Sequence, residues 1–259
     1  MRVGIYYFSA TGNTKAGLEV LAEALGELGH RCELISVERR QPSLGDHDLV
    51  GFASPVFHGL PAGVLLDFVR SLPRQEEPRP AFVMLCSGLR IGALGAGEHL
   101  MDLLASRGFV VIAASYFVGE ESHPLLRRIR HLLPGYRGDG RPGEEDKPSL
   151  RAFAEELVEA YELFREGEIR RPAYRPLMKC LSSLESRLAD ILNKSLFSKI
   201  VDEEKCDRCG FCVDACPTGA IRLDPFPVFG GACFNLSLIH ISEPTRPRLI
   251  SYAVFCLKK

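Results

Sequence analysis

Three features are absent from this 259-residue sequence, and each absence argues against a class of protein. Charge of one sign is not in excess, because 32 basic residues balance 33 acidic ones and leave a net charge of −1. We therefore expect no general affinity for nucleic acid. Long apolar runs are also missing, since stretches such as 109–118 end well short of the roughly 18 residues that a spanning helix needs. We therefore expect no membrane span.

The third absence is a catalytic signature. The sequence shows no Ser/His/Asp triad pattern, no paired-carboxylate pattern and no Walker or Rossmann glycine fingerprint, which disfavours a hydrolase or an NAD-linked dehydrogenase.

Apolar residues make up 46% and charged residues 25%, values that exclude a disordered or collagen-like chain. The chain passes from Met1-Arg2 directly into strand-like sequence without a signal peptide, so we expect a soluble, cytoplasmic protein.

Cysteine is unevenly distributed along the chain. Six of the nine cysteines lie between positions 206 and 256. A disulfide scaffold would spread its cysteines through a small secreted chain, whereas crowding at one end of a cytoplasmic one indicates a metal site.

The first 166 residues alternate apolar runs with segments of helical period. Strands are expected at 3–8, 32–37, 49–54, 81–86 and 109–118, and helices at 14–28, 61–72, 93–106 and 149–165. The strands are apolar throughout, as strands buried on both faces of a parallel sheet are. We predict an α/β domain with a doubly wound, five-stranded parallel sheet.

Two segments interrupt or follow this pattern. Residues 125–146 are rich in Arg, Gly and Pro and form an insertion that we interpret as a lid or a mobile loop. Residues 167–198 are expected to be a linker and a helix, with one apolar stripe over 177–200 that must pack against another surface. We interpret this helix as the arm that docks a C-terminal module, although a plain core helix would show the same pattern.

A phosphate-binding loop is expected directly after the first strand. Gly12 and Asn13 tolerate unusual backbone angles, so that successive amides can converge on an anion at the start of the next helix. The hydroxyls of Ser9, Thr11 and Thr14 can add further donors. The run 9–14 resembles the S/T-x-T-G-N-T phosphate loop of flavodoxins, and this resemblance implies that the domain is flavodoxin-like and binds FMN.

Two further loops would complete the flavin site at the switch point of such a sheet. The loop after the third strand holds Pro55, Phe57, His58 and Gly59; Phe57 is the candidate for stacking on the ring, and His58 for donating a hydrogen bond to it. Alternatively, Phe57 fills the core and His58 lies on the surface. The loop over 87–95 begins with Ser87 and Gly88 and lacks the Tyr or Trp that many flavodoxins have there.

The strongest motif is the run Cys206-x2-Cys209-x2-Cys212-x3-Cys216-Pro217. Three thiolates at short, even spacing can hold one iron–sulfur cube, and the Cys-Pro step turns the fourth sulfur away. The run resembles a bacterial [4Fe–4S] ferredoxin module, expected over residues 199–235. Zinc is the weaker alternative, because structural zinc usually takes two separated pairs of ligands.

Counting ligands indicates that this module is incomplete. In two-cluster ferredoxins the fourth cysteine of each run serves the other cluster. A second run would begin at Cys233, but no further cysteine follows at the expected spacing. Residues 236–259 resemble the translation of a sequencing-adaptor oligonucleotide, and we interpret them as a non-native tail; the alternative is a genuine, divergent one. We therefore expect at most one cluster here, against two in the presumed parent protein.

The order of these parts resembles the flavodoxin–ferredoxin fusion proteins of anaerobic bacteria and archaea. The resemblance implies electron transfer between FMN, iron–sulfur clusters and a redox partner, which is either a protein or a small-molecule acceptor. Two alternatives remain open: a binding or regulatory module that has lost its flavin, and a flavin-dependent reductase of a small substrate.

Overall fold

The computed structural model describes residues 1–38, 43–88, 90–120, 140–196, 200–204, 206–214, 216, 218–230 and 257–258. It divides the chain into two compact units. Unit 1 comprises residues 1–121 and 134–186, and unit 2 comprises residues 122–133 and 187–259.

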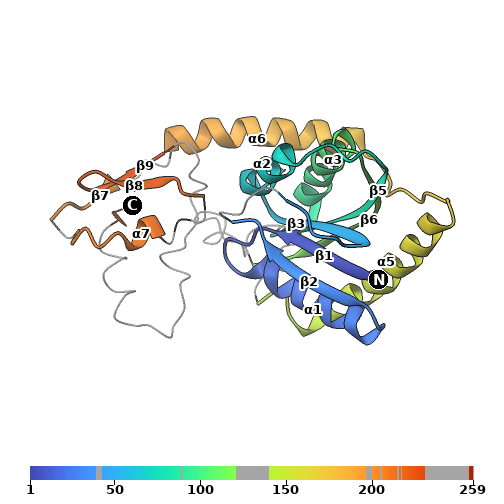
Figure 1. Cartoon of the computed structure of the whole chain (residues 1–259). Coiled ribbons are helices and arrows are strands. Elements are labelled where there is room, and N and C mark those ends of the chain that lie inside the picture. The colour runs from blue at the N-terminus through green and yellow to red at the C-terminus, as the bar shows by residue number, and fades with distance from the viewer. Residues whose placement is uncertain are drawn as a thin grey trace. The chain divides into compact units, whose positions relative to one another are not determined.

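Unit 1 is built on a parallel sheet (Figure 1). Its strands are β1 Arg2–Tyr7, β2 Arg31–Ser36, β3 Leu49–Phe57, β4 Leu60–Pro61, β5 Arg79–Ser87 and β6 Phe109–Val118. The order across the sheet is β2-β1-β3-β5-β6, all parallel, with the short β4 paired antiparallel to β3. This is the flavodoxin-like strand order, with its switch point between β1 and β3. The predicted doubly wound, five-stranded parallel sheet is confirmed.

Helices cover both faces of the sheet (Figure 1). They are α1 Asn13–Glu27, α2 Gly63–Ser71, α3 Arg90–Ser106, the 3-10 turn η2 Glu144–Asp146 and α5 Lys147–Arg165. One core cluster joins α1 and α5 to the sheet, and a second joins α2 and α3 to its other face. Strand residues such as Ile5, Phe52 and Phe82 are fully buried, which explains why the strands are apolar throughout.

The predicted insertion falls only partly within the described residues. Residues 125–139 lie outside them, and so does its interpretation as a lid or a mobile loop. At its described end, Arg141 pairs with the buried carboxylate of Asp146 through a 3.0 Å bond from Nε. Burial raises the pKa of Asp146, but Arg141 and the amide of Gly143 outweigh it and hold that pKa below its ordinary value.

The linker helix α6 spans Pro176–Leu196, so that its first half, residues 176–186, belongs to unit 1. Its apolar stripe points outward: Leu177, Leu181, Leu184 and Leu188 are each at least half exposed. The opposite, more polar face of the first half meets α3. The prediction that this helix docks the C-terminal module concerns both units together, so it stays a prediction.

Unit 2 holds the short elements of the cysteine-rich module. They are β7 Ile200–Val201, α7 Phe211–Asp214, β8 Ile221–Leu223, β9 Pro227–Phe229 and β10 Leu257–Lys258. Strands β8 and β9 form an antiparallel hairpin, and β7 pairs with β10. Because β10 lies within residues 236–259, the proposed non-native origin of that segment stays a prediction.

Candidate functional site

The sheet register brings the expected flavin loops to one edge. Tyr7 of β1 lies opposite Ala53 of β3, and Pro55 of β3 lies opposite Cys86 of β5. All these strands are parallel, so the loops that follow their carboxyl ends leave the sheet side by side. The loops over 9–14, 54–59 and 87–88 therefore lie at one edge of the sheet.

The phosphate loop has the conformation that its sequence predicts. Gly12 caps α1 with φ 89° and ψ −21°, in the left-handed region that favours glycine. The hydroxyl oxygen of Ser9 accepts the Lys15 amide at 3.2 Å, and the side-chain nitrogen of Asn13 donates to the Glu120 carbonyl at 2.9 Å. The loop is thus tied to α1 and to the segment after β6.

Thr14 is the most informative residue of this loop. Its side chain is 1% exposed, and its Oγ1 has no hydrogen-bond partner among the described residues. A buried hydroxyl without a partner costs about 1–3 kcal/mol, so native proteins seldom leave one unpaired. At the N-terminus of a helix, beside free space around Gly12, the missing partner that fits best is an anion such as a phosphate group.

The loop after β3 is a tight hairpin rather than an irregular loop. Strand β3 continues to Phe57 and pairs with β4 across His58 and Gly59, whose φ angles are 50° and 74°. Two successive left-handed residues make the primed two-residue turn that suits antiparallel strands. The expectation that the strand ends at 54 was therefore wrong by three residues.

Each predicted residue of this hairpin can now be placed. Pro55, Phe57 and His58 are half-buried, and Gly59 is buried. Phe57 packs against the core cluster of α2 and α3, as its alternative interpretation proposed. Below the turn, Ser54 is fully buried and its hydroxyl oxygen accepts the Ala62 amide at 2.9 Å, which closes the hairpin.

The third loop is shorter than the sequence suggested. Helix α3 begins at Arg90, so only residues 88 and 89 separate it from β5. Ser87 and Gly88 are half-buried, and the Ser87 carbonyl accepts the Gly119 amide at 3.2 Å. Gly119 lies so close to Cys86 that a Cβ there would be 2.4 Å from the thiol sulfur. The floor of the edge between β5 and β6 is therefore packed.

The cysteine run of unit 2 contains residues in the left-handed conformation. Arg208 has φ 59° and Gly210 has φ 76°, and the Arg208 guanidinium lies 4.5 Å from the ring centre of Phe226. Cys216 is buried, and its sulfur accepts the Ala220 amide at 3.3 Å. An N–H directed at a sulfur is the kind of contact that tunes an iron–sulfur ligand.

The other candidate cysteine ligands differ from Cys216 in their surroundings. Cys206 and Cys212 are half-buried and Cys209 is exposed, whereas Cys233 lies outside the described residues. Burial raises the pKa of Cys212, and the nearby thiols of Cys206 and Cys209 raise it further. Within the described ranges, no three His, Cys, Asp or Glu side chains are arranged to hold a metal ion. The donor chemistry of the cysteine run fits iron.

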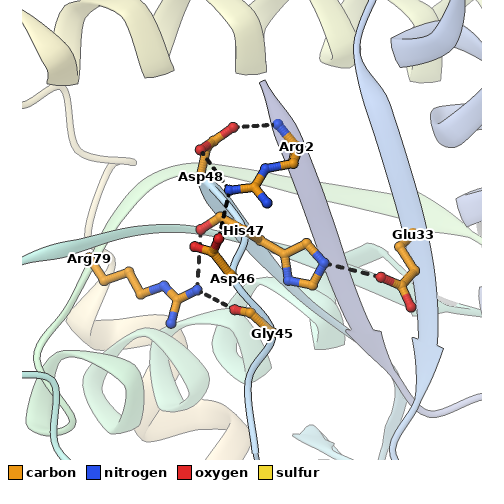
Figure 2. Close-up of polar contacts among 7 residues, drawn as sticks. All are labelled: Arg2, Glu33, Gly45, Asp46, His47, Asp48 and Arg79. Atoms are coloured by element: carbon orange, nitrogen blue, oxygen red, sulfur yellow. Dashed lines mark hydrogen bonds and ion pairs between the residues drawn. The ribbon is translucent and has the colours of Figure 1, made fainter.

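Sequence reasoning missed a polar cluster at the other edge of the sheet (Figure 2). The guanidinium of Arg2 pairs with Asp46 at 3.0 Å, and that of Arg79 donates to the Gly45 carbonyl at 2.8 Å. The ring of His47 bonds to Glu33 at 3.2 Å and covers a glycine of β1. These residues surround the amino ends of the strands, so we assign the cluster to stability rather than to ligand binding.

Two family models match the chain, a flavodoxin domain over residues 4–91 and a 4Fe-4S binding domain over residues 199–222. The chain joins a flavodoxin domain to a 4Fe-4S domain. This order confirms the resemblance drawn from the two motifs. A flavodoxin domain together with a 4Fe-4S domain supports a redox or electron-transfer role, and such a role requires a redox partner.

Other known proteins resemble parts of the chain. It is 30% identical over 191 residues to the epoxyqueuosine reductase of Synechococcus sp. (strain CC9605), which covers 70% of this chain and 54% of that protein. The chain thus spans about half the length of that curated relative. Flavodoxin 1 of Bacillus cereus is 18% identical, with 61% of this chain and 98% of that one covered and a TM-score of 0.45. A Streptococcus pneumoniae TIGR4 flavodoxin is 19% identical, with 61% and 99% covered and a TM-score of 0.45.

Among the helices that the structure describes, none combines the length and the apolar composition needed to cross a membrane.

Proposed function

We propose that the protein is an electron carrier that passes electrons between FMN and a [4Fe–4S] cluster. The flavin part of this proposal rests on the hydroxyl of Thr14 at the N-terminus of α1, which is buried and has no hydrogen-bond partner among the described residues. A bound phosphate group would accept from it and would also meet the helix amides. No side-chain cation is needed for this, because neutral donors and the helix dipole favour an anion there.

The residues that would hold the flavin come from the three loops of the shared edge. The phosphate group would bind at the first loop and the ring beside the hairpin and the short third loop; the residues are Ser9, Thr11, Gly12, Asn13, Thr14, Pro55, Phe57, His58, Gly59, Ser87 and Gly88. Bound flavin would supply the chemistry of accepting and releasing one or two electrons. The chain would supply orientation, and the half-buried His58 is the residue that would donate a hydrogen bond to the flavin ring.

Three thiolates, Cys206, Cys209 and Cys212, would hold the cluster, with Cys216 or Cys233 as the fourth ligand. A cluster bound by these thiolates would supply one-electron transfer to a redox partner. Joining both domains in one chain raises the effective concentration of each for the other.

Anaerobic purification and reconstitution test this proposal. We expect a flavin absorption spectrum, FMN on extraction, and four or fewer irons per chain that are readily lost in air. Cys209→Ser should lower the iron content and leave the flavin unchanged, whereas Cys180→Ser, an exposed cysteine outside the motif, should change neither. Eight irons per chain would contradict the single incomplete site. The absence of both chromophores would overturn the proposal.

A second candidate is a reductase of a small substrate. It is favoured by the curated relative, whose printed name is that of a reductase. Steady consumption of a substrate with chemically reduced protein as the electron source would support this candidate over a pure carrier. A third, a binding module without flavin, would be supported by a colourless flavodoxin domain.

A further inference from the structure

The first half of α6 is held on the flavodoxin domain by polar contacts. Ser183 Oγ lies 3.1 Å from Nε2 of His99, and the Lys179 ammonium pairs with Asp102. Just before the helix, the Arg175 amide donates to Oε1 of Glu98 at 2.8 Å. Glu98 is 1% exposed, so this bond lies beneath the start of α6 rather than on the surface.

The helix approaches the domain most closely at a glycine of α3. A Cβ on Gly95 would lie 2.4 Å from the carbonyl oxygen of Met178 and 2.5 Å from the Ser182 side chain. Contacts below 3.0 Å force something to move, so only glycine permits this approach. Helix α6 therefore rests with its backbone against α3, which fixes its position better than flexible side chains would.

The same face of α6 meets the hairpin turn after β3. A Cβ on Gly59 would lie 2.9 Å from the Ser182 carbonyl oxygen and 3.0 Å from Oε2 of Glu185. Gly59 is also left-handed, so two constraints fix its backbone. The turn that carries His58 is thus held between β4 on one side and the linker helix on the other.

We infer that Ser182 and Glu185 are positioning residues for the flavin, acting through the His58–Gly59 turn. This inference rests on the proposed flavin site and adds to it the element that orients one of its loops. The Ser182 carbonyl and the Glu185 carboxylate lie against Gly59 and limit outward movement of the turn, so that His58 is presented in one geometry. Both residues lie in the first half of α6, within unit 1, so this part of the helix forms the outer support of the hairpin turn.

Four variants of the full chain test the inference. Gly95→Ala adds a Cβ that displaces α6 while leaving the residues of the hairpin unsubstituted, and Glu185→Ala removes the carboxylate that touches the turn. Glu185→Gln keeps the shape of the side chain and is the conservative control. Leu184→Ser alters the outward face of the same helix, where the side chain is about half exposed, and is the matched control.

Two readouts separate the inference from the proposed function. The first is hydrogen exchange of the amides at 57–62, which needs no flavin, and the second is the FMN dissociation constant from fluorescence titration. We expect about tenfold faster exchange and about tenfold weaker FMN binding in Gly95→Ala and Glu185→Ala, with both controls within twofold of wild type. Circular dichroism confirms that each variant is folded.

The outcomes discriminate cleanly. If wild type binds FMN but folded Gly95→Ala and Glu185→Ala match it in both readouts, the inference is overturned and the flavin site stands. If exchange rises but FMN binding does not, the helix supports the turn without positioning the flavin, and the inference also fails. If wild type binds no FMN, the proposed function fails and the inference fails with it, while the exchange data still report whether α6 holds the turn.

Discussion

Replacing Thr14 by valine is expected to stabilise the flavin-free protein and to weaken flavin binding. The Thr14 hydroxyl is buried and has no partner in the described part of the chain, and valine offers the same shape without a polar atom. Removing an unpaired buried hydroxyl should recover about 1–3 kcal/mol. For a domain of this size, each kcal/mol corresponds to roughly 2–4 °C in the midpoint of thermal unfolding.

The flavin complex should respond in the opposite direction. When the hydroxyl donates to a phosphate group, the bond is charge-assisted and contributes about 1.5–3 kcal/mol. Its loss corresponds to a rise of roughly 10- to 150-fold in the dissociation constant of FMN. A single substitution thus separates a ligand-binding hydroxyl from a structural one, whose loss would lower stability and spare binding.

Both effects can be measured on the same preparations. Urea unfolding of flavin-free protein gives the stability, and titration of FMN fluorescence gives the affinity. Thr14→Ser keeps the hydroxyl and serves as the control for binding, with an affinity expected within about threefold of wild type because the charge-assisted bond is retained. Unchanged FMN affinity in Thr14→Val would refute the assignment of Thr14 as a phosphate ligand, and a less stable flavin-free protein would refute the claim that its hydroxyl is unpaired.

Three further predictions concern the flavodoxin domain. Burial raises the pKa of the Glu98 carboxyl. The stability that the neutral carboxyl provides is therefore fully present below its ordinary pKa of 4.5 and is lost as pH rises through the folded-state pKa. When urea midpoints are measured over a pH series, Glu98→Gln should flatten this part of the curve. Gly4→Ala places a Cβ 2.4 Å from the ring of His47 and should cost about 1–3 kcal/mol, while the double variant with His47→Ala should lose less than the sum of the single losses. Leu157→Ala, in the core, should cost about 2–5 kcal/mol in thermal unfolding, whereas Leu184→Ser should stay within about 0.5 kcal/mol; equal losses would contradict the assigned burial.

The sequence was a good guide to the sheet and a weaker one to its loops. Strands buried on both faces are apolar throughout, so their positions could be read to within a few residues. The hairpin after β3 was missed because its turn, His58-Gly59, depends on two left-handed residues, and residues other than glycine are uncommon in that conformation. Helix α3 begins at Arg90, three residues before its predicted start, because glycines such as Gly92 favour a loop in the sequence pattern.

The orientation of α6 was not predictable from its apolar stripe. Periodicity identifies the apolar face of a helix, and the prediction from it is that this face is packed. Here the packed face is formed by backbone contacts with Gly59 and Gly95, which contribute no apolar side chain on either partner. The cysteine run shows the same limit, since spacing identifies the donor atoms but not whether they converge. The residues assigned to flavin and iron therefore remain predictions.

The position of the N-terminus has a practical consequence. The amino group of Met1 lies 3.2 Å from Nδ1 of His30, and β1 carries the chain from there across the sheet to the phosphate loop. Six strand residues span roughly 20 Å, so an attachment at Met1 lies about that far from the phosphate loop. Immobilising the protein on a solid support through a tag at Met1 should therefore place the point of attachment about that far from the phosphate loop.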